Sequence, residues 1–96
     1  MLSRDTKAML KHILQKYIER EMQKAIIKAC ILQEFEIASM QDCVKRKEVH
    51  EHVSETLRYP YGNTLIALVK SCMRDLQVHV GTKHGYDRYF GIKKAN

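Results

Sequence analysis

The chain has 96 residues, of which 45% are apolar and 29% charged, and its formal net charge is +6. This length supports one domain with a single core, and the composition is that of a soluble globular protein. No apolar stretch is long enough to cross a bilayer, and no apolar block follows the charged N-terminus as a secretory signal would require. We therefore expect an intracellular protein without a membrane partner.

Three cysteines, Cys30, Cys43 and Cys72, stand at wide spacings and do not form a disulfide framework. Cys43 with His50 and His52 is the one combination that suggests metal ligands. Imidazoles two residues apart on a helix point about 200° apart, so they do not easily share one ion. We expect reduced cysteines in a reducing compartment, either cytoplasm or nucleus, with no metal and no cofactor.

The positive charge is concentrated in the second half of the chain. Residues 1–57 contain ten Lys and Arg against nine Asp and Glu, a net charge of +1. Residues 58–96 contain seven basic and two acidic residues, a net charge of +5. A polyanion-binding surface requires such a basic region, although many small basic proteins bind no polyanion.

The first predicted element is a helix from about Ser3 to Phe35, because this stretch has no Gly or Pro and its apolar residues recur with helical period. Ser3 or Asp5 can cap its start, and a break within residues 20–23 is an alternative to one continuous helix. Unbroken, it would be about 45–50 Å long, which is more than so small a domain can cover. We therefore expect residues 1–36 to form a homodimer interface. The predicted interface residues are Leu10, Leu14, Tyr17, Ile18, Met22 and Ala25.

Residues 37–96 are predicted to form a second unit that begins with a short extended piece near Ile37 or Val44. A helix follows from Arg46 to Leu57 and ends before the "RYPYGN" segment, where proline and glycine forbid continuation. Its buried face is expected to carry Val49, Val53 and Leu57.

A third helix is predicted from a cap at Asn63 or Thr64 to about Leu76. Its apolar stripe consists of Leu65, Leu68, Val69, Cys72 and Leu76. The opposite face is small, polar or basic and consists of Thr64, Ala67, Lys70, Ser71 and Arg74. A β-hairpin then follows, with strands at residues 77–80 and 86–92 and a five-residue turn bounded by Gly81 and Gly85.

This order of elements predicts a mainly α fold with a C-terminal β-hairpin: a winged helix-turn-helix preceded by a long helix. The third helix would read double-stranded DNA, and the basic hairpin would contact phosphates or the minor groove beside it. The predicted DNA-binding residues are Asn63, Thr64, Ala67, Lys70, Ser71, Arg74, Lys83, His84, Arg88, Lys93 and Lys94.

Aromatic and imidazole side chains also lie in this region. We expect Tyr89 to pack at the edge of the core. For Tyr61 and Tyr86 two roles are predicted as alternatives, packing against the protein or stacking on bases. The four histidines of the unit are predicted to be surface residues, and His84 could contact phosphate when protonated. The four are His50, His52, His79 and His84.

Residues 44–94 carry three segments, "VKRKEVHEHVSETL", "YGNTLIALVKSCMRDLQV" and "KHGYDRYFGIK". Together they resemble the winged-helix module at the C-terminal end of viral and phage primase-helicases of the poxvirus type, and "RYFGIKK" is the most specific piece. The resemblance implies a DNA-binding module in replication or transcription control. No Walker A motif is present, and the long first helix departs from the module, which also allows a stand-alone viral or plasmid protein.

Three other functions are weighed against duplex DNA binding. An enzyme is not expected, because no nucleophile–base pair, converging carboxylates or glycine-rich phosphate loop is recognisable. A protein-interaction module within a larger assembly is the main alternative, since the long helix could bind a partner. RNA binding is a further alternative that basic charge alone does not exclude.

Overall fold

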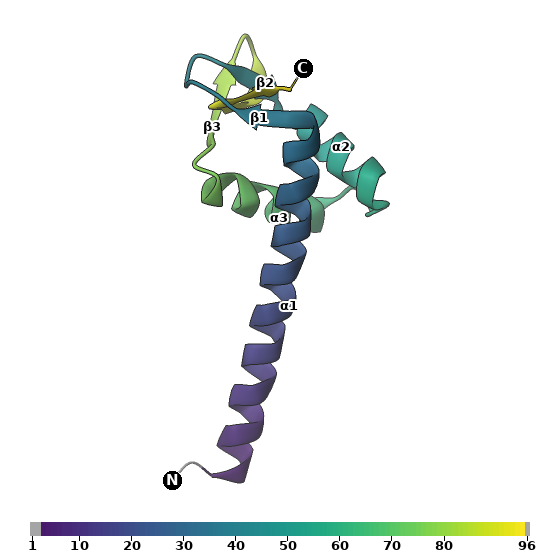
Figure 1. Cartoon of the computed structure of the whole chain (residues 1–96), viewed down its shortest axis with the longest axis vertical. Helices are drawn as coiled ribbons and strands as arrows, with labels where there is room; N and C mark the ends of the chain where they lie inside the picture. The colour runs from purple at the N-terminus through teal and green to yellow at the C-terminus, as the bar shows by residue number, and fades with distance from the viewer. Residues whose placement is uncertain (1–2, 96) are drawn as a thin grey trace.

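The structure is a computed structural model that describes residues 3–95. Within these residues the fold is mainly helical, with three helices, two short strands between the first and second helices, and antiparallel strands after the third (Figure 1). The first helix projects from a small body made by all the other elements, so the molecule measures 57 × 26 × 25 Å. The predicted order of three helices and a C-terminal hairpin is therefore confirmed.

Helix α1 (Arg4–Glu34) is continuous, and the alternative of a break at residues 20–23 is wrong. Ser3 caps its start, because the Ser3 side chain accepts a hydrogen bond from the backbone N–H of Thr6 at 3.2 Å. Only the C-terminal part of α1 packs against the body. Its buried residues are Lys24, Ile27, Cys30 and Ile31.

Helix α2 (Arg46–Leu57) and helix α3 (Asn63–Asp75) lie within a residue of their predicted bounds. The predicted cap of α3 is wrong: Gly62 occupies the N-cap position, no side chain caps this end, and Asn63 is already helical. The predicted apolar faces of both helices are buried or partly buried. They join α1 and the strands in one core, which includes Ile31, Phe35, Val49, Val53, Leu65, Val69, Met73, Tyr89 and Ile92.

In the described part of the chain, residues 3–95, five short strands form two antiparallel sheets. Strands β2 (Cys43–Lys45), β4 (Tyr86–Phe90) and β3 (His79–Lys83) form the larger sheet in the order β2-β4-β3. Strands β1 (Phe35–Ile37) and β5 (Ile92–Lys94) form the smaller one. The segment after α1 thus contains both extended pieces that the sequence offered as alternatives. The pairing of Val44 with Tyr89 and of Lys45 with Arg88 brings the start of α2 beside the hairpin.

The hairpin turn is shorter than predicted. Strand β3 continues to Lys83, and Lys83 pairs with Tyr86, so only His84 and Gly85 connect the strands. Both have positive φ, 54° and 77°, as a two-residue type I′ turn requires. Gly81 therefore belongs to a strand, where the ring of Phe90 occupies the space that a Cβ atom would need.

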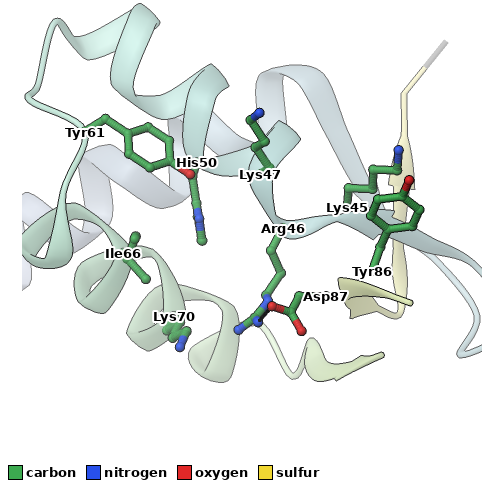
Figure 2. A pocket seen from close by; sticks show the side chains of 9 residues that line it. All are labelled: Lys45, Arg46, Lys47, His50, Tyr61, Ile66, Lys70, Tyr86 and Asp87. Carbon is green, nitrogen blue, oxygen red and sulfur yellow. Dashed lines mark ion pairs between the residues drawn. The ribbon is translucent and has the colours of Figure 1, made fainter. Parts of the chain in front are cut away.

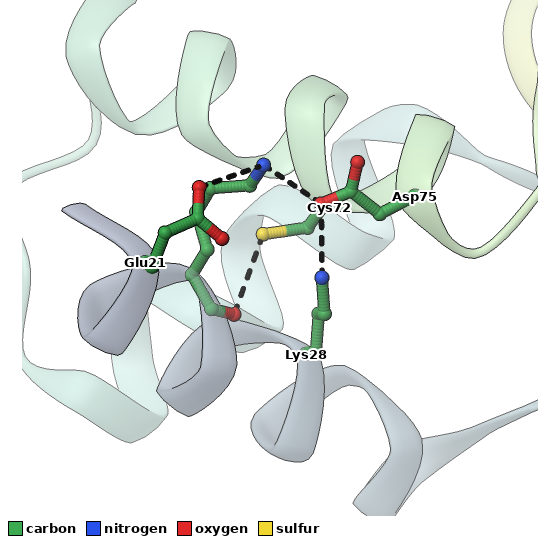
Figure 3. Close-up of polar contacts among 5 residues, drawn as sticks. Glu21, Lys28, Cys72 and Asp75 are labelled. Atoms are coloured by element: carbon green, nitrogen blue, oxygen red, sulfur yellow. Dashed lines mark hydrogen bonds and ion pairs between the residues drawn. The ribbon is translucent and has the colours of Figure 1, made fainter. Parts of the chain in front are cut away.

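Ion pairs fasten α1 to α3 (Figure 3). The Asp75 carboxylate lies 2.7 Å from Lys24 Nζ and 2.9 Å from Lys28 Nζ. These contacts hold the pKa of Asp75 down at about 2, with the hydrogen bond from Lys24 as the largest cause. The Cys72 thiol donates to the Lys24 carbonyl oxygen at 3.5 Å, and burial raises the pKa of this thiol to about 11. Cys72 is therefore a core residue held in its neutral form.

Candidate functional site

A groove of about 580 Å³ lies between α3, the start of α2 and the first residues of β4 (Figure 2). Its lining combines four basic side chains, two tyrosines, a histidine, an isoleucine and one acid. These residues are Lys45, Arg46, Lys47, His50, Tyr61, Ile66, Lys70, Tyr86 and Asp87. The basic residues come from separate elements, since Lys70 belongs to α3 and the other three to the junction of β2 and α2.

The groove has a net positive charge. Four cations face one carboxylate, and that carboxylate, Asp87, forms an ion pair with Arg46. The Nε atom of Arg46 is buried and has no hydrogen-bond partner among residues 3–95. Lys45 lies over the ring of Tyr86, with Nζ 4.2 Å from the ring centroid. The remaining positive charge is available for an anion.

The N-terminus of α2 opens beside the same groove. The N-cap residue is Lys45, and no side chain accepts a hydrogen bond from the first turn. The first N–H groups of a helix have no partner within the helix, and the helix dipole places positive potential there. This end of α2 therefore adds backbone donors to the cations of the groove, an arrangement that suits a phosphate group.

His50 anchors the inner wall of the groove, and the prediction that it is a surface residue is wrong. It is 5% exposed, and its Nε2 atom is 2.6 Å from the hydroxyl of Tyr89. Burial, and then the charges of Arg46 and Lys70, lower its pKa to about 4. His50 is therefore neutral at physiological pH. Burial also raises the pKa of Tyr89. Tyr89 packs as expected, but inside the core rather than at its edge, and its hydroxyl is bonded within the protein.

The predicted contact residues of α3 share one side of that helix. Asn63, Ala67, Lys70 and Arg74 are exposed and recur at spacings of three and four residues. Thr64, also exposed, and Ser71, half-buried, flank them. This outer side is continuous with the groove, because Lys70 belongs to both.

The hairpin residues differ in how free their side chains are. Lys83 and His84 are exposed at the turn. Arg88 is half-buried, donates from Nε to the Lys83 carbonyl oxygen at 3.1 Å, and lies 5.8 Å from the ring centroid of Tyr86. Arg88 therefore stabilises the hairpin as well as contributing charge.

Lys93 and Lys94 lie away from the other predicted contacts, on β5 of the smaller sheet. Lys93 Nζ is 3.4 Å from Glu36, and Lys94 Nζ is 4.0 Å from Glu34. Lys94 also lines a second depression with four glutamates, Glu34, Glu48, Glu51 and Glu55. The structure does not bring these two lysines to the groove, and acidic neighbours offset their charge.

Three basic groove residues were absent from the predicted contacts: Lys45, Arg46 and Lys47. The sequence signal that could have found them is the run "KRK" at the start of a predicted helix. Its position beside β4 depends on the pairing of β2 with β4, and its proximity to Lys70 depends on the packing of α2 against α3; the sequence revealed neither contact.

The predicted interface residues of α1 lie on the projecting part of the helix or on the side turned away from the body. Leu10, Leu14, Tyr17, Ile18, Met22 and Ala25 are all exposed. Their apolar surface extends to Leu32, over about 33 Å at 1.5 Å per residue. Within residues 3–95 no other element covers it.

Comparison with protein-family models, curated proteins and solved structures gave no match. Among the helices of residues 3–95, none combines the length and apolar character that crossing a membrane would require.

Proposed function

We propose that this chain is a double-stranded DNA-binding protein of the winged helix-turn-helix type. In this proposal α3 enters the major groove with Lys70 and Arg74, and the β3–β4 hairpin lies on flanking phosphates with Lys83 and His84. The observation that carries the proposal is the continuous basic surface formed by the outer side of α3 and the adjoining groove.

The strand arrangement supports this assignment. In a winged helix, a strand before the second helix pairs with the hairpin and holds the hairpin beside the third helix. Here β2 pairs with β4, and β4 pairs with β3. The resemblance of residues 44–94 to the winged-helix module of viral and phage primase-helicases points to the same class.

We further propose that two copies associate through α1. The exposed apolar side from Leu10 to Leu32 needs a partner of similar length, and the same helix of a second copy supplies one. Residues 3–17 contain four cations (Arg4, Lys7, Lys11, Lys16) against Asp5, a net charge of +3. An antiparallel pair keeps these basic ends apart and is therefore favoured over a parallel one.

Two single substitutions test the division of roles between helix and hairpin. Arg74→Ala should weaken binding to a preferred duplex by about 1–3 kcal/mol and relax its preference at one base pair, because a helix can align donors with base edges. Lys83→Ala should weaken all duplexes nearly equally and reduce the salt slope by about one, because an exposed turn supplies charge alone. Fluorescence anisotropy at several salt concentrations measures both.

The alternative of a protein-interaction module is favoured by one observation, the exposed apolar side of α1. In that case α1 would bind a different protein and the basic surface would be solvated. If both substitutions leave duplex binding unchanged at low salt, the DNA assignment is wrong and this alternative replaces it.

A further inference from the structure

Duplex binding by α3 and the hairpin leaves two features of the groove unused, its concavity and the ring of Tyr61. The volume of about 580 Å³ lies within the range of about 300–1,000 Å³ typical of small-ligand sites. Tyr61 is 48% exposed although it lines this concave surface. We propose that the groove binds one unpaired nucleotide, with its base stacked on Tyr61 and its phosphate at the start of α2. This inference rests on the nucleic-acid binding proposed above.

The orientation of the Tyr61 ring supports a stacking role. It meets the ring of His50 edge-on, with centroids 6.1 Å apart and planes at 68°, and His50 is itself fixed by Tyr89. Such a contact orients the Tyr61 ring and occupies at most one of its two faces, and 48% of Tyr61 is exposed, which leaves room for a base on the other face. Paired bases inside a duplex already have neighbours above and below, so away from duplex ends a tyrosine within a groove stacks on an unpaired base.

The distribution of charge along the groove matches the two ends of a nucleotide. In Figure 2, Tyr61 lies at one end of the lining, Lys45 and Tyr86 lie at the other, and Lys47 lies between them. Lys70 faces the same space from α3. A flat base and an anionic phosphate require this combination of an aromatic end and a cationic end. The uncapped start of α2 adds backbone N–H donors for the phosphate.

The only acid in the lining does not oppose this assignment. Asp87 forms an ion pair with Arg46, so its charge is neutralised and Arg46 is fixed in place. The three lysines of the lining, Lys45, Lys47 and Lys70, have no ion-pair partner within the groove. Lys47 does lie 3.7 Å from Glu51, but the two side chains are 78% and 47% exposed, and such solvent-accessible pairs are weak.

A duplex with a short single-stranded overhang, compared with the same duplex with blunt ends, tests the proposal directly. Fluorescence anisotropy at low salt should give roughly tenfold tighter binding to the overhang duplex, the usual order of one base–aromatic stack. Tyr61→Leu should remove this difference and leave blunt-duplex binding unchanged. Tyr61→Phe keeps the ring and should keep the difference.

A pair of lysine substitutions tests whether binding in the groove requires positive charge. Lys47→Ala should weaken binding to the overhang duplex, whereas Lys11→Ala removes the same charge from the projecting part of α1 and should preserve the preference for the overhang. Competition with deoxyadenosine monophosphate distinguishes a free nucleotide from a nucleotide within a single strand as the ligand. Competition that depends on Tyr61 supports a free nucleotide as ligand, and preference for the overhang without such competition supports a single strand.

Failure of this proposal and failure of duplex binding give different results. Equal binding of blunt and overhang duplexes by the unaltered protein overturns the groove assignment and leaves duplex binding intact. An overhang preference that survives Tyr61→Leu also overturns it. Binding of a single-stranded oligonucleotide that depends on Tyr61, without binding of the blunt duplex, supports the groove and overturns the proposed duplex function.

Discussion

The hydrogen bond between His50 and Tyr89 connects the core to the wall of the groove. Tyr89 is fully buried on β4, His50 lies on α2, and the two side chains join at 2.6 Å. Removal of one partner leaves a buried polar atom without a hydrogen bond. The free-energy cost of this unsatisfied atom exceeds the net stabilisation that the bond itself provides. This pair should therefore determine both the stability of the domain and the position of the groove wall.

Tyr89→Phe should lower the free energy of unfolding by about 1–3 kcal/mol, because it leaves the Nε2 atom of His50 unpaired. Urea denaturation followed by circular dichroism measures the change. Tyr86→Phe is the matched control on the same strand: Tyr86 is 55% exposed, so its substitution should change stability by less than about 0.5 kcal/mol. Equal effects of the two substitutions would show that the His50 contact does not contribute.

Acid should destabilise the protein in two steps. The pKa of His50 is lowered to about 4 in the folded state, so the unfolded chain takes up a proton first as pH falls below about 6.5. The contribution of neutral His50 to the free energy of unfolding is fully present above pH 6.5. It decreases by up to about 2 kcal/mol towards pH 4, a value reduced for solvent screening at the groove. Urea denaturation across this range measures the slope, and His50→Gln should remove most of it.

The second step belongs to Asp75. Its pKa is lowered to about 2 by Lys24 and Lys28, so this carboxylate stabilises the fold above pH 4 and loses that contribution as pH falls towards 2. Because the ion pair between Lys24 and Asp75 joins α1 to α3, protonation of Asp75 should weaken the packing of α1 against the body. A pH profile without any change between pH 4 and 2 would contradict this role.

At the scale of elements, the two-residue turn determines where the hairpin presents its charge. His84 has φ of 54° and Gly85 has φ of 77°. Asn tolerates positive φ better than His, whereas Ala at such a position is strained by about 1–2 kcal/mol. We expect His84→Asn to preserve or raise the melting temperature and Gly85→Ala to lower it, as measured by circular dichroism. A lower melting temperature for His84→Asn would indicate that the imidazole itself stabilises the turn.

The elements that sequence predicted well are those with a strong local signal. Helices α2 and α3 have regular apolar faces and breakers between them, and Pro60 and Gly62 define the gap. The turn was predicted too long because Gly81 looks like a turn residue, but here it allows close approach of the Phe90 ring. Local patterns do not reveal such a contact between strands.

The groove could not be predicted for a similar reason. Lys45 and Lys47 are about 25 residues from Lys70 in sequence, and tertiary packing brings them together: β2 pairs with β4, and α2 packs against α3. The outer side of α3 was predictable, because its residues belong to one helix. The sequence predicts a surface position for His50, because it does not show that the buried hydroxyl of Tyr89, on a distant strand, supplies a hydrogen-bond partner inside the protein.

At the scale of the whole molecule, the exposed side of α1 predicts a dimer. Ile18 and Met22 are 55% and 62% exposed, so changing both to Glu should leave each copy folded. It should convert the proposed dimer to a monomer, because each copy would bring two carboxylates into the apolar interface. Light scattering at micromolar concentration, with circular dichroism as the check on folding, measures this.

His12→Glu together with Lys16→Glu is the matched control, with the same spacing on a different side of the helix. We expect this variant to remain a dimer. A monomer for the unaltered protein would contradict self-association through α1 and leave the apolar side for a different partner.

The central claim is that the basic surface of α3, the groove and the hairpin binds nucleic acid through phosphates. The most direct test is the affinity of the unaltered protein for a random-sequence duplex, measured by fluorescence anisotropy over a range of salt concentrations. We predict detectable binding at low salt that falls steeply as salt rises, by roughly 0.9 log units per log unit of salt for each phosphate contacted. No binding at low salt, or binding that does not change with salt, would contradict the claim.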